Sequence, residues 1–280
     1  MYFTDELRNY INSLDLPKNQ TYTSDSGLYE STYETGRYSF DVKDNNVGSG
    51  ARNNFFVPLF LNYDILILRI SELYKRKIEN TGGYMNKTLD YYNKNAKVFV
   101  DGTKDVAFHE MQDKFLGLLP EGAAVLDFGC GSGRDTKYFL ERGYKVDAID
   151  GSEELCKIAS DYAGISVKPM LFNELRAENQ YDGIWACASI LHLPKDELKE
   201  VFGLMVKALK SKGIIYTSFK YGQFEGMRNG RYFTDFTEEN FRSFIKDIEG
   251  ITIQDTWMTG DVRPGRGNEK WLNLILMKTN

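Results

Sequence analysis

The stretch from Val125 to Asp135, VLDFGCGSGRD, decides the fold class of this chain. Its apolar start is typical of a buried strand, and its three alternating glycines precede a segment with helical periodicity. Glycine has no side chain and can adopt a positive φ angle, so backbone N–H groups and a helix N-terminus can approach a ligand closely here. The stretch therefore predicts a ligand loop between a strand and a helix of an α/β domain.

The spacing of these glycines bears on the kind of ligand. Dinucleotide-binding loops carry GxGxxG, whose third glycine allows close packing of helix and strand. Here Gly129, Gly131 and Gly133 are spaced GxGxG, and Arg134 stands where the dinucleotide pattern has its third glycine. The loop therefore favours a nucleotide-type ligand other than a dinucleotide.

Two aspartates accompany the loop. Asp127 precedes the first glycine by two residues and indicates a positively charged group near the end of the strand. Asp150 ends the next strand segment, where a carboxylate can accept hydrogen bonds from the two hydroxyls of a ribose. A dinucleotide also contains ribose, so Asp150 alone does not distinguish the two kinds of cofactor.

From about Leu89 onward, strand and helix patterns alternate with short breaks, which predicts a mostly parallel sheet. The seven strand segments are AAVLDFG, KVDAID, ISVKPML, YDGIWACASI, GIIYTSFKY, ITIQDTWMTG and KWLNLILMK. The helix segments are RDTKYFLERGY, SEELCKIASDYAG, KDELKEVFGLMVKALKSKG and TEENFRSFIKDIEG. Ser152 and Thr237 are the expected N-caps of the second and fourth helices, and the last two strands are close enough to form a hairpin.

The first 84 residues have a different character. TDELRNYINSL predicts an amphipathic helix, and residues 19–54 are polar and without strong periodicity. An apolar helix or strand pair follows to about Lys77, and ENTGGYMNKT marks a turn-rich boundary. We expect residues 1–84 to be a helical or irregular appendage, acting as a lid or dimer element, and residues 85–280 to form the main domain.

The composition narrows the classes of function. The net charge of −5 gives no general basic character, so binding to nucleic acid is not favoured. The start lacks the pattern of a signal peptide and no apolar run is long enough to span a membrane, which predicts a cytoplasmic protein without a membrane partner. Three widely spaced cysteines and two histidines indicate neither a disulfide framework nor a metal site.

Three motifs in order resemble the class I S-adenosylmethionine-dependent methyltransferases: VLDFGCGSGRD, VDAIDGSEELCKIA and YDGIWACASILHLP. LHLP, NGRYF and VRPGRGNEKWLN are most similar to small bacterial methyltransferases of the tellurite-resistance type. The resemblance covers about Leu89 to Lys278. It implies a Rossmann-like three-layer α/β sandwich with a seven-stranded, mostly parallel sheet whose last strand is antiparallel. It also implies S-adenosylmethionine as the cofactor and S-adenosylhomocysteine as the product.

The resemblance further implies which residues surround the cofactor. Asp127 would lie near its ammonium group, Asp150 would bind the ribose hydroxyls, and Tyr92 would belong to a covering helix. Phe172 and Asn173 would border the adenine, although the family often has an acidic residue where this chain has Asn173. The full implied set is Tyr92, Asp127, Gly129, Cys130, Gly131, Gly133, Asp150, Gly151, Ser152, Phe172, Asn173 and Ala188.

The acceptor site is expected at the loops after the fourth, fifth and sixth strands, because ligands of open α/β sheets bind beyond the carboxyl ends of the strands. The expected acceptor-binding residues are His192, Lys220, Arg228, Arg231, Arg263, Arg266 and Trp271, and the candidate catalytic residues are His192 and Tyr221. Arginines concentrated on two loops indicate a small anionic acceptor, unless they pair with Glu225, Asp261 and Glu269. His192 is suited to removing a proton, or anchors its loop.

Three functions remain open at this point. We expect a small-molecule methyltransferase, monomeric or homodimeric. An RNA or protein methyltransferase would use residues 1–84 to recognise its substrate. A non-catalytic cofactor-binding module is the third alternative, and the intact glycine loop with Asp150 argues against it.

Overall fold

The computed structural model describes residues 21–23, 29–34, 37–42, 83–263 and 265–279. The chain divides into two compact units, residues 1–64 and 65–280. In the first unit, β1 (Thr21–Thr23), β2 (Tyr29–Glu34) and β3 (Arg37–Val42) form an antiparallel sheet. The polar composition predicts irregular structure here, but the tyrosines and threonines of these segments have high β-propensity. The helix predicted for residues 4–14 and the apolar segment that ends near residue 77 lie outside the described residues.

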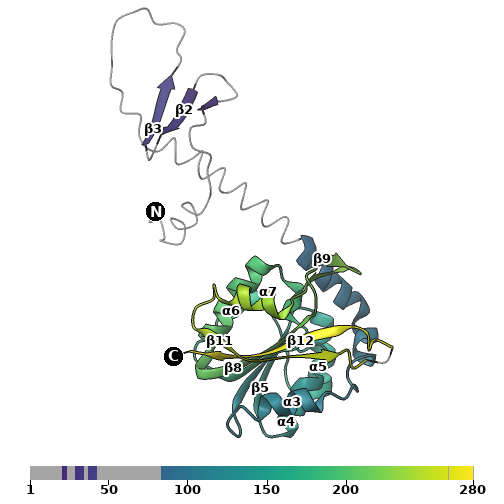
Figure 1. Ribbon diagram of the computed structural model, residues 1–280. Helices are drawn as coiled ribbons and strands as arrows, with labels where there is room; N and C mark the ends of the chain where they lie inside the picture. The colour runs from purple at the N-terminus through teal and green to yellow at the C-terminus, as the bar shows by residue number, and fades with distance from the viewer. Residues whose placement is uncertain (1–20, 24–28, 35–36, 43–82, 264, 280) are drawn as a thin grey trace, which may run out of the picture. The chain divides into compact units, whose positions relative to one another are not determined.

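The second unit is built on a seven-stranded sheet with the strand order β11-β12-β8-β7-β4-β5-β6 (Figure 1). β12 is antiparallel to both of its neighbours, and the other pairs are parallel. This confirms the predicted sheet with its antiparallel last strand. The strands are β4 (Ala124–Phe128), β5 (Lys145–Asp150), β6 (Lys168–Pro169), β7 (Tyr181–Ala186), β8 (Leu209–Lys220), β11 (Ile251–Gly260) and β12 (Lys270–Lys278).

Helices cover both faces of this sheet, because its buried strands alternate their side chains between two apolar layers. Leu126 and Ile184 pack with α6 and α7, whereas Val125 and Trp185 pack with α3 and α4. The predicted three-layer sandwich is thereby confirmed. The helices are α3 (His109–Leu116), α4 (Arg134–Glu141), α5 (Glu153–Ala163), α6 (Lys195–Ala208) and α7 (Glu238–Ile245), with short 3₁₀ turns η1 (Phe172–Glu174) and η2 (Ile190–His192).

The predicted helix caps are present. The Ser152 hydroxyl accepts from the Leu155 N–H at 3.2 Å and begins α5, and the Thr237 hydroxyl accepts from the Asn240 N–H at 3.2 Å and begins α7. These caps hold the helix starts in place. For α5 this matters directly, because its start lies beside Asp150 at the end of β5.

Three boundaries differ from the sequence prediction. Residues 83–101 are helical, so the turn-rich boundary does not extend past residue 82. α6 ends at Ala208 and β8 begins with the next residue, earlier than the glycine at residue 213 suggests. The loop after β8 contains a hairpin of β9 (Glu225–Arg228) and β10 (Arg231–Thr234). Its turn residues Asn229 and Gly230 both have positive φ angles, as a two-residue Asn-Gly hairpin requires.

Among the described residues, no helix is both long enough and apolar enough to cross a bilayer.

Candidate functional site

The main pocket opens at the carboxyl ends of β4, β5, β7 and β8. It lies where the chain reverses its direction across the sheet, since β5 and β6 follow on one side of β4 and β7 and β8 on the other. Such a switch point is where open α/β sheets bind ligands. The helix at residues 83–101 covers one side of the pocket through Met85, Thr88, Leu89, Tyr92 and Phe99.

The glycine loop after β4 is shaped by close packing. Gly129 has a φ of 88°, and a Cβ atom there would lie 2.5 Å from the Cβ of Ser189. Gly131 has a φ of 56°, and its Cβ would lie 3.1 Å from the Phe99 ring. A larger residue at Gly129 would collide with Ser189, and one at Gly131 would require the Phe99 ring to shift, so these glycines let the backbone line the pocket directly.

Asp150 is held rigidly at the end of β5. Its Oδ2 accepts from the Gly131 N–H at 2.9 Å and its Oδ1 from the Ser152 N–H at 2.9 Å. Burial raises the pKa of this carboxyl group, while the backbone donors of Ser152, Gly131 and Gly151 act in the opposite direction. A carboxylate offers about four acceptor positions, so two remain for a ligand in the pocket.

Asp127 does not line the pocket, and its place beside the cofactor's ammonium group stays a prediction. The side chain is 2% exposed, and its Oδ2 accepts from the Thr136 hydroxyl at 2.6 Å. Burial, and next the nearby carboxylate of Asp135, raise the pKa of Asp127. The hydrogen bond with Thr136 joins β4 to α4.

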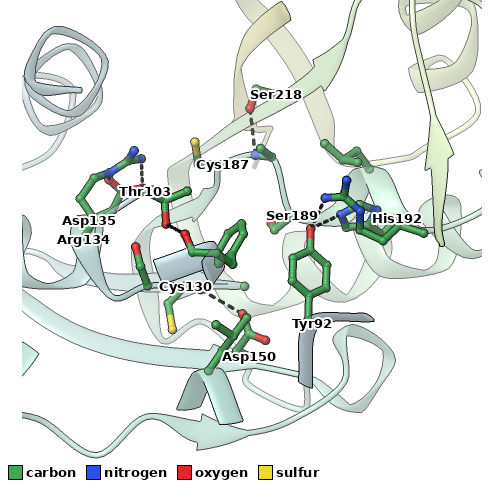
Figure 2. A pocket seen from close by; sticks show the side chains of 18 of the residues that line it. Tyr92, Thr103, Cys130, Arg134, Asp135, Asp150, Cys187, Ser189, His192 and Ser218 are labelled. Carbon is green, nitrogen blue, oxygen red and sulfur yellow. Dashed lines mark hydrogen bonds and ion pairs between the residues drawn. The ribbon is translucent and has the colours of Figure 1, made fainter. Parts of the chain in front are cut away.

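Asp135, at the start of α4, does line the pocket, and the sequence reasoning missed it. Arg134 holds it with two hydrogen bonds, Nε to Oδ1 at 2.7 Å and Nη2 to Oδ2 at 2.9 Å. The Trp185 indole donates to Oδ2 at 2.8 Å, and the Gln112 amide donates to Oδ1 at 2.6 Å. Figure 2 shows Arg134 and Asp135 at the opposite end of the pocket from Tyr92 and His192.

Tyr92 and His192 face each other at the acceptor end (Figure 2), with the Tyr92 hydroxyl 2.8 Å from His192 Nε2. Nδ1 of the same imidazole lies 2.5 Å from the Tyr232 carbonyl oxygen. A carbonyl only accepts, so Nδ1 carries the proton and Nε2 accepts from Tyr92. Burial lowers the pKa of His192 to about 3, which keeps the imidazole neutral.

Most of the predicted acceptor-site cations are paired with carboxylates. Arg228 contacts Asp235 at 2.6 Å, Lys220 contacts Glu269, and Arg266 contacts Glu269 at 2.6 Å. Arg263 binds Asp261 through Nη2 at 2.5 Å and Nε at 2.9 Å. The alternative that the loop arginines pair with nearby carboxylates is therefore correct for Asp261 and Glu269. Glu225 pairs with Lys195 instead.

Arg231 is different. No ion pair joins it to a carboxylate of the described residues, and its Nε is buried without a hydrogen-bond partner there. Its Nη1 donates to the Tyr92 hydroxyl at 3.3 Å, and its guanidinium lies over the Tyr91 ring at 4.4 Å from the centroid. Aromatic rings hold this cation in place without neutralising it.

The structure brings most, but not all, of the predicted site residues to the main pocket. The pocket is lined by the predicted residues Tyr92, Gly129, Cys130, Gly131, Asp150, Gly151, Phe172, Ala188, His192, Lys220, Arg231, Arg263, Arg266 and Trp271. Gly133, Ser152 and Asn173 do not line it, and Asn173 is exposed at η1. Tyr221 and Arg228 line a second hollow instead.

Residues 83–101 supply part of the lining that the sequence reasoning missed, and a signal for them was present. Met85, Leu89, Tyr92 and Phe99 recur at intervals close to the helical period. Thr88 accepts from the Tyr232 N–H at 3.0 Å, and the Ser152 hydroxyl donates to the Asn93 amide oxygen at 2.6 Å. These contacts tie the helix to both sides of the pocket.

Comparisons with known proteins match the part of the chain that contains the glycine loop. Residues 125–213 match the family model described as a methyltransferase domain. Over 117 residues the chain is 32% identical to the "Putative methyltransferase YqeM" of Bacillus subtilis (strain 168), an alignment that covers 38% of this chain and 47% of that protein. The chain thus spans about half the length of this relative.

Two solved structures show the shared fold. The Burkholderia thailandensis 1,6-didemethyltoxoflavin-N1-methyltransferase, with bound 1,6-didemethyltoxoflavin and S-adenosylhomocysteine, has a TM-score of 0.56 at 20% identity, covering 93% of this chain and all of that one. The magnesium protoporphyrin IX methyltransferase of Synechocystis PCC 6803, with bound S-adenosylmethionine, has a TM-score of 0.52 at 20% identity, covering 68% of this chain and 94% of that one.

Residues 125–213 thus match a methyltransferase domain, and the two solved structures share the fold of this chain. Those two structures contain S-adenosylhomocysteine or S-adenosylmethionine, the product and the cofactor that the sequence resemblance implies. The finer resemblance to the tellurite-resistance type stays a prediction.

Proposed function

We propose that this protein is an S-adenosylmethionine-dependent methyltransferase that acts on a small acceptor carrying a negative charge. The observation that carries the proposal is the position of Asp150, which Gly131 and Ser152 hold beside a glycine loop that has no room for a Cβ atom at Gly129. This combination offers a ribose-binding carboxylate and an open backbone at one switch point of the sheet.

The residues present fit this cofactor. Asp150 would accept from the two ribose hydroxyls, and the backbone from Gly129 to Gly131 would pass along the methionine part. Leu171 and Phe172 would contact the adenine with apolar surface. When bound, the cofactor supplies a methyl group attached to a sulfonium, which is a good leaving group.

The chain itself would orient the acceptor and exclude water. The helix at residues 83–101 covers the pocket, and an in-line displacement gains much of its rate from positioning and desolvation. Tyr92 would contact the acceptor and His192 would position it: the neutral imidazole accepts from the Tyr92 hydroxyl through Nε2 and so fixes the direction of that hydroxyl. Arg231 would hold the negative charge of the acceptor, because no carboxylate of the described residues neutralises it.

Calorimetry on the full chain tests the cofactor assignment. We expect S-adenosylmethionine and S-adenosylhomocysteine to bind with one-to-one stoichiometry and NAD not to bind. Binding of NAD alone would refute the proposal.

A screen with methyl-labelled S-adenosylmethionine tests the acceptor class. The acceptors should include oxyanions, carboxylates, thiols, neutral analogues of the carboxylates and tRNA. We expect label in a small anion and not in its neutral analogue. Label in tRNA with no small-molecule turnover would favour the RNA methyltransferase alternative.

A further inference from the structure

A second hollow lies beside the main pocket, at the outer side of the β9–β10 hairpin and the loop between β11 and β12. We call it the basic hollow. It shares Lys220, Arg231, Phe233 and Arg266 with the main pocket, so the two are adjacent. The basic hollow is lined by Lys220, Tyr221, Arg228, Asn229, Arg231, Phe233, Asp235, Arg266, Asn268, Glu269 and Lys270.

We propose that the basic hollow binds a phosphate group of the methyl acceptor, whose reacting end lies in the main pocket beside Tyr92 and His192. This inference rests on the proposed function and makes the acceptor class more specific. An acceptor bound in this way would have two parts, an outer phosphate and an inner group that receives the methyl.

The charge of the basic hollow supports this assignment. Five cationic side chains and two acidic ones line it, which leaves an excess of three positive charges in a chain whose net charge is −5. Local positive charge on an acidic protein concentrates anions at that place. The acidic members, Asp235 and Glu269, are each bound to cations at the wall of the hollow.

Arg231 provides the polar group that points to a ligand. Its Nε is buried and has no hydrogen-bond partner in the described part of the chain, although a buried donor of this kind usually has one. Asp235 Oδ1 is likewise buried and unpartnered within that part. A phosphate oxygen accepts from arginine N–H groups, so a phosphate bound at Arg231 would supply the acceptor that Nε lacks.

The same arginine links the two hollows. Its Nη1 donates to the Tyr92 hydroxyl at 3.3 Å, and that hydroxyl lies 2.8 Å from His192 Nε2. An anion bound at Arg231 is therefore two hydrogen bonds away from the imidazole. A small molecule can reach from the phosphate site to the reacting position without a long spacer.

Phosphate fits the basic hollow better than a single carboxylate or a nucleic acid does. Arg231 alone could bind a carboxylate in a fork, whereas five cations around one hollow suit a group with several charged oxygens. A nucleic acid requires positive charge extended along a surface, and the overall charge of the chain is negative.

Isothermal titration calorimetry tests this inference. The protein is first saturated with S-adenosylhomocysteine, and inorganic phosphate is then titrated into it. We expect one phosphate to bind per chain. Arg231→Met should lower that affinity by about tenfold or more, and Arg231→Lys should recover part of it, because the charge remains while the fork is lost. Lys145→Met removes an exposed cation at the start of β5, away from the hollow, and should leave the affinity unchanged. Thermal unfolding of each variant shows whether it is folded.

Each outcome bears on a different claim. If the protein does not bind S-adenosylhomocysteine, the proposed function itself is refuted. If S-adenosylhomocysteine binds and phosphate does not, or if Arg231→Met and Lys145→Met bind phosphate equally, the basic hollow is not a phosphate site. If tRNA binds tightly in a filter assay and Arg231→Met weakens that binding while inorganic phosphate does not compete, the hollow serves RNA and the inference is wrong.

Discussion

The Tyr92 hydroxyl donates a hydrogen bond of 2.8 Å to Nε2 of His192, across 100 residues of sequence. The Tyr232 carbonyl accepts from Nδ1 of the same ring, so both nitrogens of the buried imidazole are engaged. The pair joins the helix that covers the pocket to the turn after β7. One contact therefore joins the covering helix to the residues proposed to meet the acceptor.

Tyr92→Phe should destabilise the protein by about 1 to 3 kcal/mol, because it leaves a buried imidazole acceptor without a donor. S-adenosylmethionine affinity should change little, since the ring that covers the pocket remains. Urea unfolding measures the first effect and calorimetry the second. Tyr91→Phe is the matched control on the same helix and should be close to wild type in both. Equal destabilisation by the two substitutions would show that the Tyr92 hydrogen bond contributes nothing.

His192 should make the stability of the protein depend on pH. Its pKa is lowered to about 3 by burial, whereas the unfolded chain has the ordinary value near 6.5. Between these values the unfolded state binds more protons, so stability falls as the pH is lowered from about 6.5 toward 3, by at most about 1.4 kcal/mol per pH unit.

Urea unfolding at several pH values between 7 and 4 measures this dependence. The comparison is between wild type and His192→Asn, because the raised pKa values of Asp127 and Asp150 act on both proteins alike. The variant should lose less stability than wild type as the pH falls. Parallel curves would contradict the buried neutral imidazole.

Asp150→Asn should lower the affinity for S-adenosylmethionine by about tenfold or more, because an amide has one acceptor oxygen where the carboxylate has two. Gly131 and Ser152 would compete with the ribose for that oxygen. Asp147→Asn is the matched control. Asp147 lies on the same strand, outside the pocket, and accepts from the Tyr181 hydroxyl at 2.8 Å. Calorimetry should show normal affinity for this control, and an equal loss in both variants would remove Asp150 from the cofactor site.

Gly129→Ala should destabilise the protein more than Gly143→Ala. Both glycines have positive φ angles, 88° and 83°, so each substitution carries about 1 to 2 kcal/mol of backbone strain. Only at Gly129 would the new Cβ collide with Ser189, at 2.5 Å, which adds about 1 to 3 kcal/mol. Urea unfolding of the two variants separates strain from collision. Equal losses would mean that the loop has space for a side chain.

The fold was predictable because its signals are local. The strand and helix periods, the caps Ser152 and Thr237, and the glycines of the loop each act within a few residues. The hairpin after β8 also had a local signal, the Asn229-Gly230 pair, which the prediction of a plain loop overlooked. The position of Asp150 followed from strand order, because carboxyl ends of parallel strands share one edge of the sheet.

The acceptor end was less predictable because its properties arise from contacts between distant segments. Sequence placed four arginines on two loops, but which of them remain without a carboxylate depends on where Asp235, Asp261 and Glu269 fall in space. The same holds for Asp127 and Asp135, since the direction of a side chain at a strand end or helix start selects which carboxylate reaches the pocket.

By itself, the sequence VLDFGCGSGRD determined a glycine loop between a strand and a helix of a parallel sheet, because glycine spacing constrains the backbone locally. The tertiary structure alone decided that Tyr92 meets His192 and that Arg231 lies among aromatic rings instead of carboxylates. Those relationships join residues far apart in the chain, and burial gives them their energetic weight by removing the water that would otherwise satisfy each group.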